Sequence, residues 1–431
     1  PELTYVNISS NNADTSWAKV SDSIIIVFTS SEVISLDSLA LIPAISILGQ
    51  ISSVSDLQNN KFSAVYVPTD SDAEGEATFE IQFSDLAGND GVPVTVSTNN
   101  TKVMFDKTPP ADFTVGLLTP TGGNQVADFW NLTNTGMDII VPVANDTTLK
   151  NGTVQLYGKV GSNNFEVLGN ISTILPIEIN ADKTISIAGD LIEGLTGFAE
   201  GQTIYIKAIM NDRPGNSKEG SQSITEILID ETPATITPIF IISNNNNSSL
   251  AKVGDSVTVS FSTSESLIDT VVKIEDQLAI VSGLGSNQFI GVYEMGEANT
   301  EGIVPFEISF IDFQGNPFTI SDSTTDASQV TFDKTKPTLD PVTITSDNSC
   351  SAGAIAKAEN IVTINFTSLE TLLSTFAVVM GDTVSVNNQG SNNFKIEHQL
   401  DAEDSEGDIL FLIRVTDLSG NISEDIITTT D

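Results

Sequence analysis

The sequence has almost none of the residues on which most catalytic and metal centres depend. Its 431 residues include one cysteine, Cys350, and one histidine, His398. A single cysteine forms no intrachain disulfide, so Cys350 is either an ordinary loop residue or the site of an intermolecular bridge. Zinc lacks the Cys and His ligands that it needs. A Ser–His–Asp or Cys–His arrangement would depend on His398, which stands in an expected strand without a local catalytic signature. We therefore expect no enzymatic activity.

Basic residues and long apolar runs are scarce too. The chain has 17 Lys and Arg against 57 Asp and Glu, a formal net charge of −40. Nucleic-acid binding needs clustered basic residues, and anionic membranes would repel this surface. No apolar run reaches the roughly 18 residues of a membrane span. We expect no nucleic-acid partner and no membrane insertion in this segment, and a surface that is either solvated in salt or binds divalent cations.

What the sequence does have is a repeat. Three segments are nearly the same, each a turn followed by a run rich in β-branched residues. In the second and third segments the run alternates with period two, which indicates a strand. The segments are residues 17–32, 250–265 and 355–370, and the second reads Leu-Ala-Lys-Val-Gly-Asp-Ser-Val-Thr-Val-Ser-Phe-Ser-Thr-Ser-Glu.

Two further signatures mark the ends of the repeats. An Asp-x-x-Gly-Asn turn, in which Asp accepts backbone N–H bonds and Gly supplies a positive φ, occurs at residues 85–89, 212–216, 312–316 and 417–421. A closing strand followed by Asp and then Pro, which ends ladder hydrogen bonding, occurs at residues 105–109, 229–233 and 332–337. The linkers are too short for free tumbling, so we expect semi-rigid joints. The signatures predict four domains: residues 1–108, 109–232, 233–336 and 337–431.

The second predicted domain and the chain ends deserve separate interpretations. Residues 109–232 form a longer, divergent domain: the Ala-Lys-Val-x-Asp strand is missing, residues 131–143 stand in its place, and residues 190–195 are either a helical turn or a loop. We expect the same sandwich with altered edge strands.

The first residues resemble those after a linker Pro, and residues 426–431 are interpreted as ending where a linker Asp stands. We therefore expect a piece of a longer array.

These strings resemble the tandem immunoglobulin-like repeats of large bacterial and archaeal surface proteins, such as surface-layer proteins and adhesins. The Ala-Lys-Val-Gly-Asp-Ser-Val-Thr-Val-Ser-Phe string at 251–261, the Asp-x-x-Gly-Asn turn and the Phe-Asp-Lys-Thr-x-Pro closure carry the resemblance. It covers the first, third and fourth domains well, but the second only at its turn and linker. It implies an all-β fold, a tandem array of immunoglobulin-like β-sandwich domains, used as a stalk, surface layer or adhesin segment.

Calcium is the candidate ligand, because it takes six to eight oxygen ligands from carboxylates, amides and carbonyls. Acidic loops recur at residues 69–75, 294–302 and 401–407. The Asp of each Asp-x-x-Gly-Asn turn is expected near a linker acid, as in the interdomain calcium sites of cadherins. The alternative is that these Asp residues cap turns and the loops are solvated, since the EF-hand pattern is absent. The candidate ligands are Asp85, Asp106, Asp212, Asp230, Asp312, Asp333 and Asp417.

Glycosylation is a second candidate modification. The chain has ten Asn-x-Ser/Thr sequons, a slight excess over roughly seven expected by chance. Four of them gather in the second domain, at Asn131, Asn145, Asn151 and Asn170.

Two functions remain open at this stage. The first is a rod-like structural segment of a surface layer, filament or stalk, whose partners are copies of itself or neighbouring domains of a longer array. The alternative is a calcium-dependent adhesin stalk or binding module. Binding modules usually expose aromatic side chains, and only 6% of this chain is aromatic, which favours the structural function.

Overall fold

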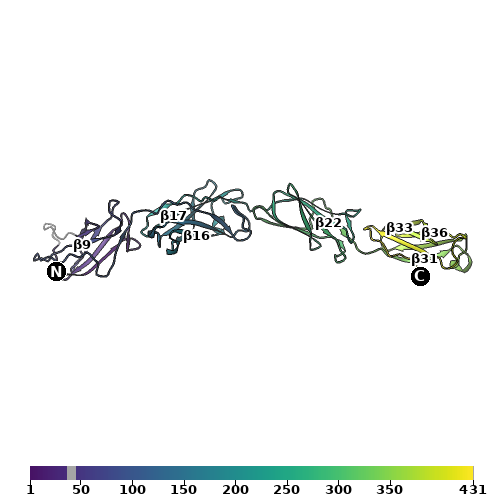
Figure 1. Ribbon diagram of the computed structural model, residues 1–431, viewed down its shortest axis with the longest axis horizontal. Helices are drawn as coiled ribbons and strands as arrows, with labels where there is room; N and C mark the ends of the chain where they lie inside the picture. Colours follow the sequence, from purple (N-terminus) through teal and green to yellow (C-terminus); the bar gives the residue numbers. More distant parts are fainter. Residues whose placement is uncertain (36–44, 431) are drawn as a thin grey trace. The chain divides into compact units, whose positions relative to one another are not determined.

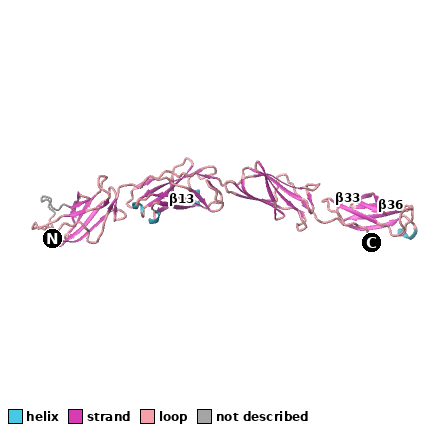
Figure 2. Cartoon of the chain, viewed as in Figure 1, coloured by secondary structure: helices cyan, strands magenta, loops and turns pink. Residues whose placement is uncertain are grey.

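The computed structural model describes residues 1–35 and 45–430. Strands make up nearly all the regular structure of these residues, and the helices are a few short turns (Figure 2). The buried apolar side chains form four separate clusters, which lie within residues 6–105, 115–229, 234–332 and 339–415. Each cluster falls inside one predicted domain. The predicted fold class, all-β with immunoglobulin-like sandwiches, is confirmed.

The chain divides into two compact units, Pro1–Thr232 and Pro233–Asp431, and each unit contains two of the four clusters. Figure 1 follows the chain through the four sandwiches by colour, from purple at the first domain to yellow at the end of the fourth. No helix among the described residues is long and apolar enough to cross a membrane.

The first domain shows why these sequences form sandwiches. Its strand β3 is apolar at almost every position, yet Ile24, Ile26 and Phe28 are fully buried while the residues between them are half-buried, because successive strand residues face opposite sides of a sheet. Its sheets run β1-β3-β7-β6, β5-β4-β9 and β2-β10-β8. The strands are β1 (Leu3–Ser10), β2 (Trp17–Ala18), β3 (Ile24–Ser30), β4 (Ile45–Ile47), β5 (Gln50–Ile51), β6 (Ser53–Asp56), β7 (Lys61–Tyr66), β8 (Gly75–Glu76), β9 (Phe79–Ile81) and β10 (Met104–Phe105).

The second domain keeps the plan with longer strands and three short helices. Its sheets are β11-β13-β16 and β12-β19-β17-β14-β15, with β18 paired to β17. The elements are β11 (Leu118–Thr121), β12 (Phe129–Trp130), β13 (Gly136–Val143), the 3-10 helix η1 (Thr147–Leu149), β14 (Thr153–Val160), β15 (Glu166–Thr173), the 3-10 helix η2 (Pro176–Glu178), β16 (Ala181–Ala188), α1 (Gly189–Glu193), β17 (Thr203–Asn211), β18 (Ser217–Glu219) and β19 (Ile227–Ile229).

The Ala-Lys-Val-x-Asp string is missing from this domain, but the strand that it marks in the other repeats has a structural counterpart here. Strand β12 pairs in parallel with β19 just as β2 does with β10. The turn after it is closed by the backbone N–H of Asn131 donating to Asn134 Oδ1 at 2.8 Å, where Lys19 donates to Asp22 Oδ2 at 2.9 Å in the first domain. The sequence pattern does not show this turn, because Asn134 stands where the first domain has Asp22 and Trp130 stands where it has Ala18.

The third domain repeats the arrangement of the first. Its sheets are β20-β22-β26-β25, β24-β23-β28-β29 and β21-β30-β27. The strands are β20 (Ile236–Ser243), β21 (Leu250–Ala251), β22 (Ser256–Thr263), β23 (Leu267–Ile274), β24 (Gln277–Leu278), β25 (Ile280–Gly285), β26 (Gln288–Glu294), β27 (Gly302–Ile303), β28 (Phe306–Asp312), β29 (Pro317–Ser321) and β30 (Thr331–Phe332).

The fourth domain has two sheets among its described residues, β31-β32-β36-β35 and β34-β33-β37. The small third sheet of the first and third domains, built around β10 and β30, has no counterpart in the described part of this domain. The elements are β31 (Leu339–Ser346), the 3-10 helix η3 (Cys350–Gly353), β32 (Ile361–Ser368), β33 (Leu372–Val379), β34 (Asp382–Val384), β35 (Val386–Gly390), β36 (Asn393–Gln399) and β37 (Phe411–Asp417).

The alignment of residues 426–431 with a linker is wrong. Asp431 itself lies outside the described residues, but Thr430 fixes the register. Its backbone N–H donates to Val342 O at 2.9 Å and its Oγ1 accepts from Val342 N at 2.9 Å. Thr325 makes the same two bonds to Ile239, at 2.8 and 3.1 Å. Thr430 therefore corresponds to Thr325, which precedes the closing strand of the third domain rather than its linker.

Candidate metal centre

Each linker acid is held in place by the turn that ends the closing strand. Asp106 Oδ1 accepts from Thr108 N at 3.0 Å, and Asp333 Oδ1 accepts from Thr335 N at 3.0 Å. Because Oδ1 is occupied in this way, the second carboxylate oxygen of each side chain remains for another partner. The short strands β10 and β30 thus each lead into a turn that fixes one carboxylate at the end of the first and of the third domain.

The acidic loops hold the linkers to their own domains. Lys334 Nζ donates to the carbonyl oxygens of Glu297 and Asn299, both at 2.8 Å, and Thr335 Oγ1 donates to Glu301 Oε1 at 2.6 Å. In the first domain Lys107 and Thr108 make the equivalent bonds to residues 70–74. The Lys and Thr of the Phe-Asp-Lys-Thr signature therefore explain these two loops without a metal ion.

The Asp-x-x-Gly-Asn turns are closed by their own side chains. In the last turn, Asp417 Oδ1 accepts from Asn421 N at 2.8 Å and Asp417 Oδ2 accepts from Asn421 Nδ2 at 2.9 Å. Asn421 Nδ2 also donates to the linker carbonyl Asp333 O at 3.0 Å. The turn in the second domain does the same, since Asn216 Nδ2 donates to Asp106 O at 3.1 Å. The turns at residues 212–216 and 417–421 therefore lie beside the linker that precedes their own domain.

In the second unit this arrangement gathers three carboxylates. One oxygen of each of Asp333, Glu370 and Asp417 lies within 4.8 Å of the others. An open cleft of about 480 Å³ is lined by Asp333 and Glu370 of this cluster and by Glu301. Burial raises the pKa of Asp333 and of Glu370, and the neighbouring negative charges raise both further. Like charges this close repel one another, and a cation would relieve that repulsion.

The first unit shows the same crowding at Asp106. This side chain is only 6% exposed, and its Oδ2 is buried without a hydrogen-bond partner among the described residues. Burial, together with the negative charges of Asp212 and Glu74, raises the pKa of Asp106 to about 6. Burial also raises the pKa of Asp212, with Asp146 adding to it. A buried carboxylate oxygen that accepts no hydrogen bond is costly unless a cation meets it.

Direct contacts between neighbouring domains supplement the acids. Asn12 Nδ2 donates to Pro214 O at 2.8 Å, and the corresponding Asn245 Nδ2 donates to Ser419 O at 2.9 Å. In the first unit Arg213 Nε also pairs with Asp14 Oδ2 at 2.7 Å. These bonds join the two domains inside each unit.

The other predicted ligands are placed as follows. Asp85 accepts hydrogen bonds from Ala87 and Asn89 within its own turn, and the bonds from Asn89 lower its pKa. Asp312 is fully buried and accepts from Asn316 N at 2.8 Å and Ala234 N at 3.2 Å. Asp230 accepts from Thr232 N at 3.3 Å. All three remain predictions.

Glu370 is the member of this carboxylate cluster that sequence reasoning missed. A signal for it was present, because each of the three repeated segments ends in a glutamate two residues after its strand, at residues 32, 265 and 370. The strand β32 ends at Ser368, and this places Glu370 beside the linker of the preceding domain.

The donor set fits calcium. Every side chain in the cluster offers carboxylate oxygens, backbone carbonyls lie nearby, and the cleft leaves room for water, which suits an ion of six to eight oxygen ligands. The residues with nitrogen and sulfur ligands lie elsewhere. His398 stands on β36 with its Nε2 3.9 Å from Asp404 Oδ2, and Cys350 is exposed in η3.

The four sequons of the second domain differ in exposure. Asn131 is fully buried, and its Nδ2 donates to Asn124 O at 2.7 Å, so a glycan on this nitrogen is incompatible with the folded domain. The side chains of Asn145, Asn151 and Asn170 are exposed. These three remain candidates.

No protein-family model and no curated protein matches this chain. Among solved structures, the chain is similar to a Ca²⁺-stabilized adhesin that helps an Antarctic bacterium reach out and bind ice, with a TM-score of 0.45, 14% identity, and 99% of this chain and 98% of that chain covered. A tetra-tandem repeat from the extending region of a large adhesion protein gives a TM-score of 0.30 and 15% identity, with 99% of both chains covered. A D1–D4 ectodomain fragment of ICAM-5 gives 0.32 and 12%, with 100% and 99% covered. At these TM-scores the likenesses carry no argument about function.

Proposed function

We propose that this chain is an extracellular structural segment, built from immunoglobulin-like repeats, of a surface layer, filament or stalk, with no catalytic role. The observation that supports it best is the cluster of Asp333, Glu370 and Asp417, where the third domain meets the fourth. Carboxylates from two neighbouring domains can bind one cation together, and the cation then holds the two domains against each other. The net charge of −40 suits a surface solvated in salt.

We propose calcium as the ion that these carboxylates hold. The linker Asp333, the turn Asp417 and the post-strand Glu370 would hold it in the second unit, and Asp106 with Asp212 would do so in the first. Bound calcium supplies positive charge where the carboxylates repel one another. The hydrogen bonds from Asn216 and Asn421 to the linker carbonyls keep turn and linker together.

Thermal unfolding with and without calcium tests the proposal. Full-length protein is stripped with chelator, and calorimetric melting is followed as calcium is added. We expect the melting temperature to rise with calcium concentration, since a ligand at 100 times its Kd stabilises the native state by about 2.7 kcal/mol. Asp333→Asn should lose most of the rise in the second unit. The matched control Asp276→Asn, at an exposed turn position with φ 58° that asparagine adopts readily, should keep it. A melting temperature that ignores calcium would contradict the calcium proposal.

A patch in the second domain favours the alternative, a binding module of an adhesin. Lys159 Nζ lies 5.0 Å from the ring centroids of Phe165 and Tyr205, and Lys207 Nζ lies 4.6 Å from that of Phe165. A hollow of about 430 Å³ adjoins them, lined in part by Phe165 and Glu219. Binding to a panel of glycans that is lost in Lys159→Ala would support this function over a purely structural one.

A further inference from the structure

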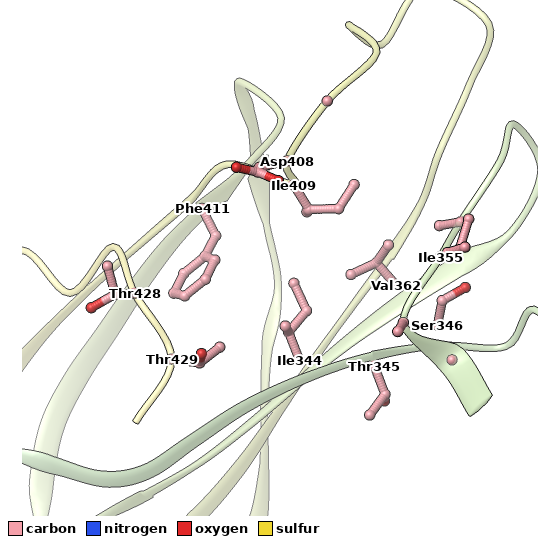
Figure 3. Close-up of a pocket in the computed structure, with 14 residues that line it drawn as sticks. Ile344, Thr345, Ser346, Ile355, Val362, Asp408, Ile409, Phe411, Thr428 and Thr429 are labelled. Carbon is pink, nitrogen blue, oxygen red and sulfur yellow. The ribbon is translucent and has the colours of Figure 1, made fainter. Parts of the chain in front are cut away.

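A hollow on the second domain differs in charge from two others in the described part of the chain. The hollow in Figure 3, of about 600 Å³ in the fourth domain, has Asp408 as its one charged lining residue. The cleft between the third and fourth domains is lined by acids and by no basic residue. The hollow of about 430 Å³ in the second domain is lined instead by Phe165 and Lys207, with Glu219 as its acid. A basic and aromatic lining is unexpected in a chain of net charge −40.

Two cross-strand pairs stand beside this hollow. On β14 and β17, Tyr157 lies opposite Lys207, and Lys159 lies opposite Tyr205. All four residues alternate with buried ones, so their side chains share the outer face of the sheet. Phe165, in the loop before β15, completes a group that we call the lysine–aromatic face.

The other domains carry different residues at the same register. The residues five positions before the Asp of each Asp-x-x-Gly-Asn turn are Glu80, Lys207, Glu307 and Leu412. Their cross-strand partners are Ser46, Tyr157, Lys273 and Val378, in the same order. The sandwich therefore forms with three other pairs of side chains at this place, and its packing does not require a lysine opposite a tyrosine.

The two lysines converge on one ring. Lys159 Nζ lies 5.0 Å and Lys207 Nζ lies 4.6 Å from the ring centroid of Phe165. Lys207 is paired with Glu219 at 2.8 Å. No carboxylate of the described residues pairs with Lys159, whose contacts are the rings of Phe165 and Tyr205. The face thus has one ammonium group in excess, and an ammonium held against aromatic rings away from bulk water attracts an anion strongly.

The rest of the lining narrows the class of anion. Glu219 only accepts hydrogen bonds, while the side chains of Ser221 and Gln222 both donate and accept them. The hydroxyl groups of a sugar suit all three, whereas an acidic peptide would bring its carboxylates against Glu219. The rings of Tyr157 and Tyr205 are half-buried, and the C–H groups of a sugar ring pack against such surfaces. One excess ammonium matches one negative charge per sugar, which is the charge of a uronic acid.

We propose that the lysine–aromatic face of the second domain is a binding site for a polysaccharide of uronic acids. Lys159 donates to the sugar carboxylate, and the sugar hydroxyls bond to Glu219, Ser221 and Gln222 in the hollow. The negative charge elsewhere on the chain does not prevent this binding, because at physiological salt exposed charges more than about 8 Å apart are largely screened. The inference rests on the binding-module alternative proposed above and names its ligand.

Titration of the full chain with tetragalacturonic acid tests the proposal, with binding followed by saturation-transfer NMR and calorimetry. Chelator is present throughout, because calcium would link the uronate to carboxylates elsewhere on the chain. We expect the acid to bind, and its methyl ester, which has the same shape without the charge, to bind at least about tenfold more weakly. Absence of binding, or equal binding of acid and ester, overturns the proposal.

Substitutions locate the binding on the chain. Lys159→Met removes the charge and keeps the apolar stem, so it should weaken binding of the acid at least about tenfold while changing the melting temperature by no more than about 2 °C. The matched control Lys150→Met removes an exposed charge from the same domain and should bind like the unsubstituted chain. Glu219→Gln should strengthen binding by roughly two- to fivefold, because it releases Lys207 from an exposed ion pair. If Lys159→Met binds as well as Lys150→Met, the site is not this face.

Two other partners decide the class of ligand. Tighter binding of a sulfated maltotetraose than of the uronate would overturn the assignment to uronic acids. Dimerisation of the chain that depends on Lys159, measured by sedimentation without any binding of the uronate, would overturn it too. If another sugar binds through Lys159 and the uronate does not, the binding module stands and its ligand is misassigned. Calcium enters none of these readouts, so failure here leaves the calcium proposal untouched, and a melting temperature that ignores calcium leaves this one untouched.

Discussion

Replacing Asp106 by asparagine should change the stability of the first unit in opposite directions with and without calcium. The pKa of Asp106 is raised from 3.8 to about 6 by burial and by the charges of Asp212 and Glu74. This shift of about two units, at about 1.4 kcal/mol each, means that ionised Asp106 costs the folded state up to about 3 kcal/mol at pH 7.5. Asparagine removes the charge but keeps an oxygen for Thr108 N.

In chelator, Asp106→Asn should therefore stabilise the first unit by about 1–3 kcal/mol at pH 7.5. The same shift sets a pH dependence for the unsubstituted protein. A carboxyl whose pKa is higher in the folded state binds its proton more tightly there. The destabilisation is therefore absent below about pH 4, grows between pH 4 and 6, and is complete above about pH 6. Asp106→Asn should flatten this part of the profile. In calcium the substitution removes a proposed ligand, so it should destabilise instead.

The assay is calorimetric or denaturant unfolding at pH 4.5 and 7.5, in chelator and in calcium, with the fluorescence of Trp17 and Trp130 reporting on the first unit. Asp128→Asn is the matched control, because Asp128 is exposed and has φ 67°, which suits asparagine. It should change stability by no more than about 0.5 kcal/mol in any condition. If Asp106→Asn destabilises the chelated protein at pH 7.5, the inference that its buried charge is unfavourable is wrong.

Further substitutions test the remaining contacts, each measured by calorimetric melting. Phe332→Ala should destabilise the third domain by about 3–5 kcal/mol, because it empties a side-chain position that is 1% exposed. Asn421→Ala should cost about 1–2 kcal/mol even in chelator, since it removes bonds to Asp333 O and Asp417. Arg213→Ala should cost no more than about 1 kcal/mol, and less at high salt, because its pair with Asp14 is partly exposed. Gly302→Ala should cost about 1–3 kcal/mol, because φ is +126° there.

Strand alternation and turn chemistry made most of the fold predictable. The period-two run after Lys252 predicted β22, and the Asp-x-x-Gly-Asn strings predicted turns that the structure closes through Asp417 and Asn421. The second domain was harder because its turn uses Asn131 and Asn134 where the pattern expects lysine and aspartate. The turn keeps the same hydrogen bond in both domains, but the residues that form it differ, so the sequence pattern does not reveal it.

The candidate site was predictable only in part, for a physical reason. Linker and turn acids are marked by local motifs, so Asp333 and Asp417 were found from sequence. Glu370 belongs to no turn motif, and its role depends on which domain end lies beside it. The calcium prediction for the acidic loops stays a prediction. Their charge density suggested calcium, but Lys334 and Thr335 of the chain itself take the oxygens of the loop before Gly302.

The two kinds of contact between neighbouring domains have separable consequences. The hydrogen bonds of Asn216 and Asn421 to linker carbonyls connect uncharged groups, so they hold at any salt concentration or pH that leaves the domains folded. The carboxylates around Asp106 and Asp333 oppose the same geometry whenever they are ionised without a counter-ion, because burial strengthens their repulsion. A joint held only by the hydrogen bonds of these asparagine side chains would have a stability that does not depend on pH or on the cations in solution. If the carboxylates bind a cation as proposed, the stability of the joint also depends on the cations in the surrounding solution.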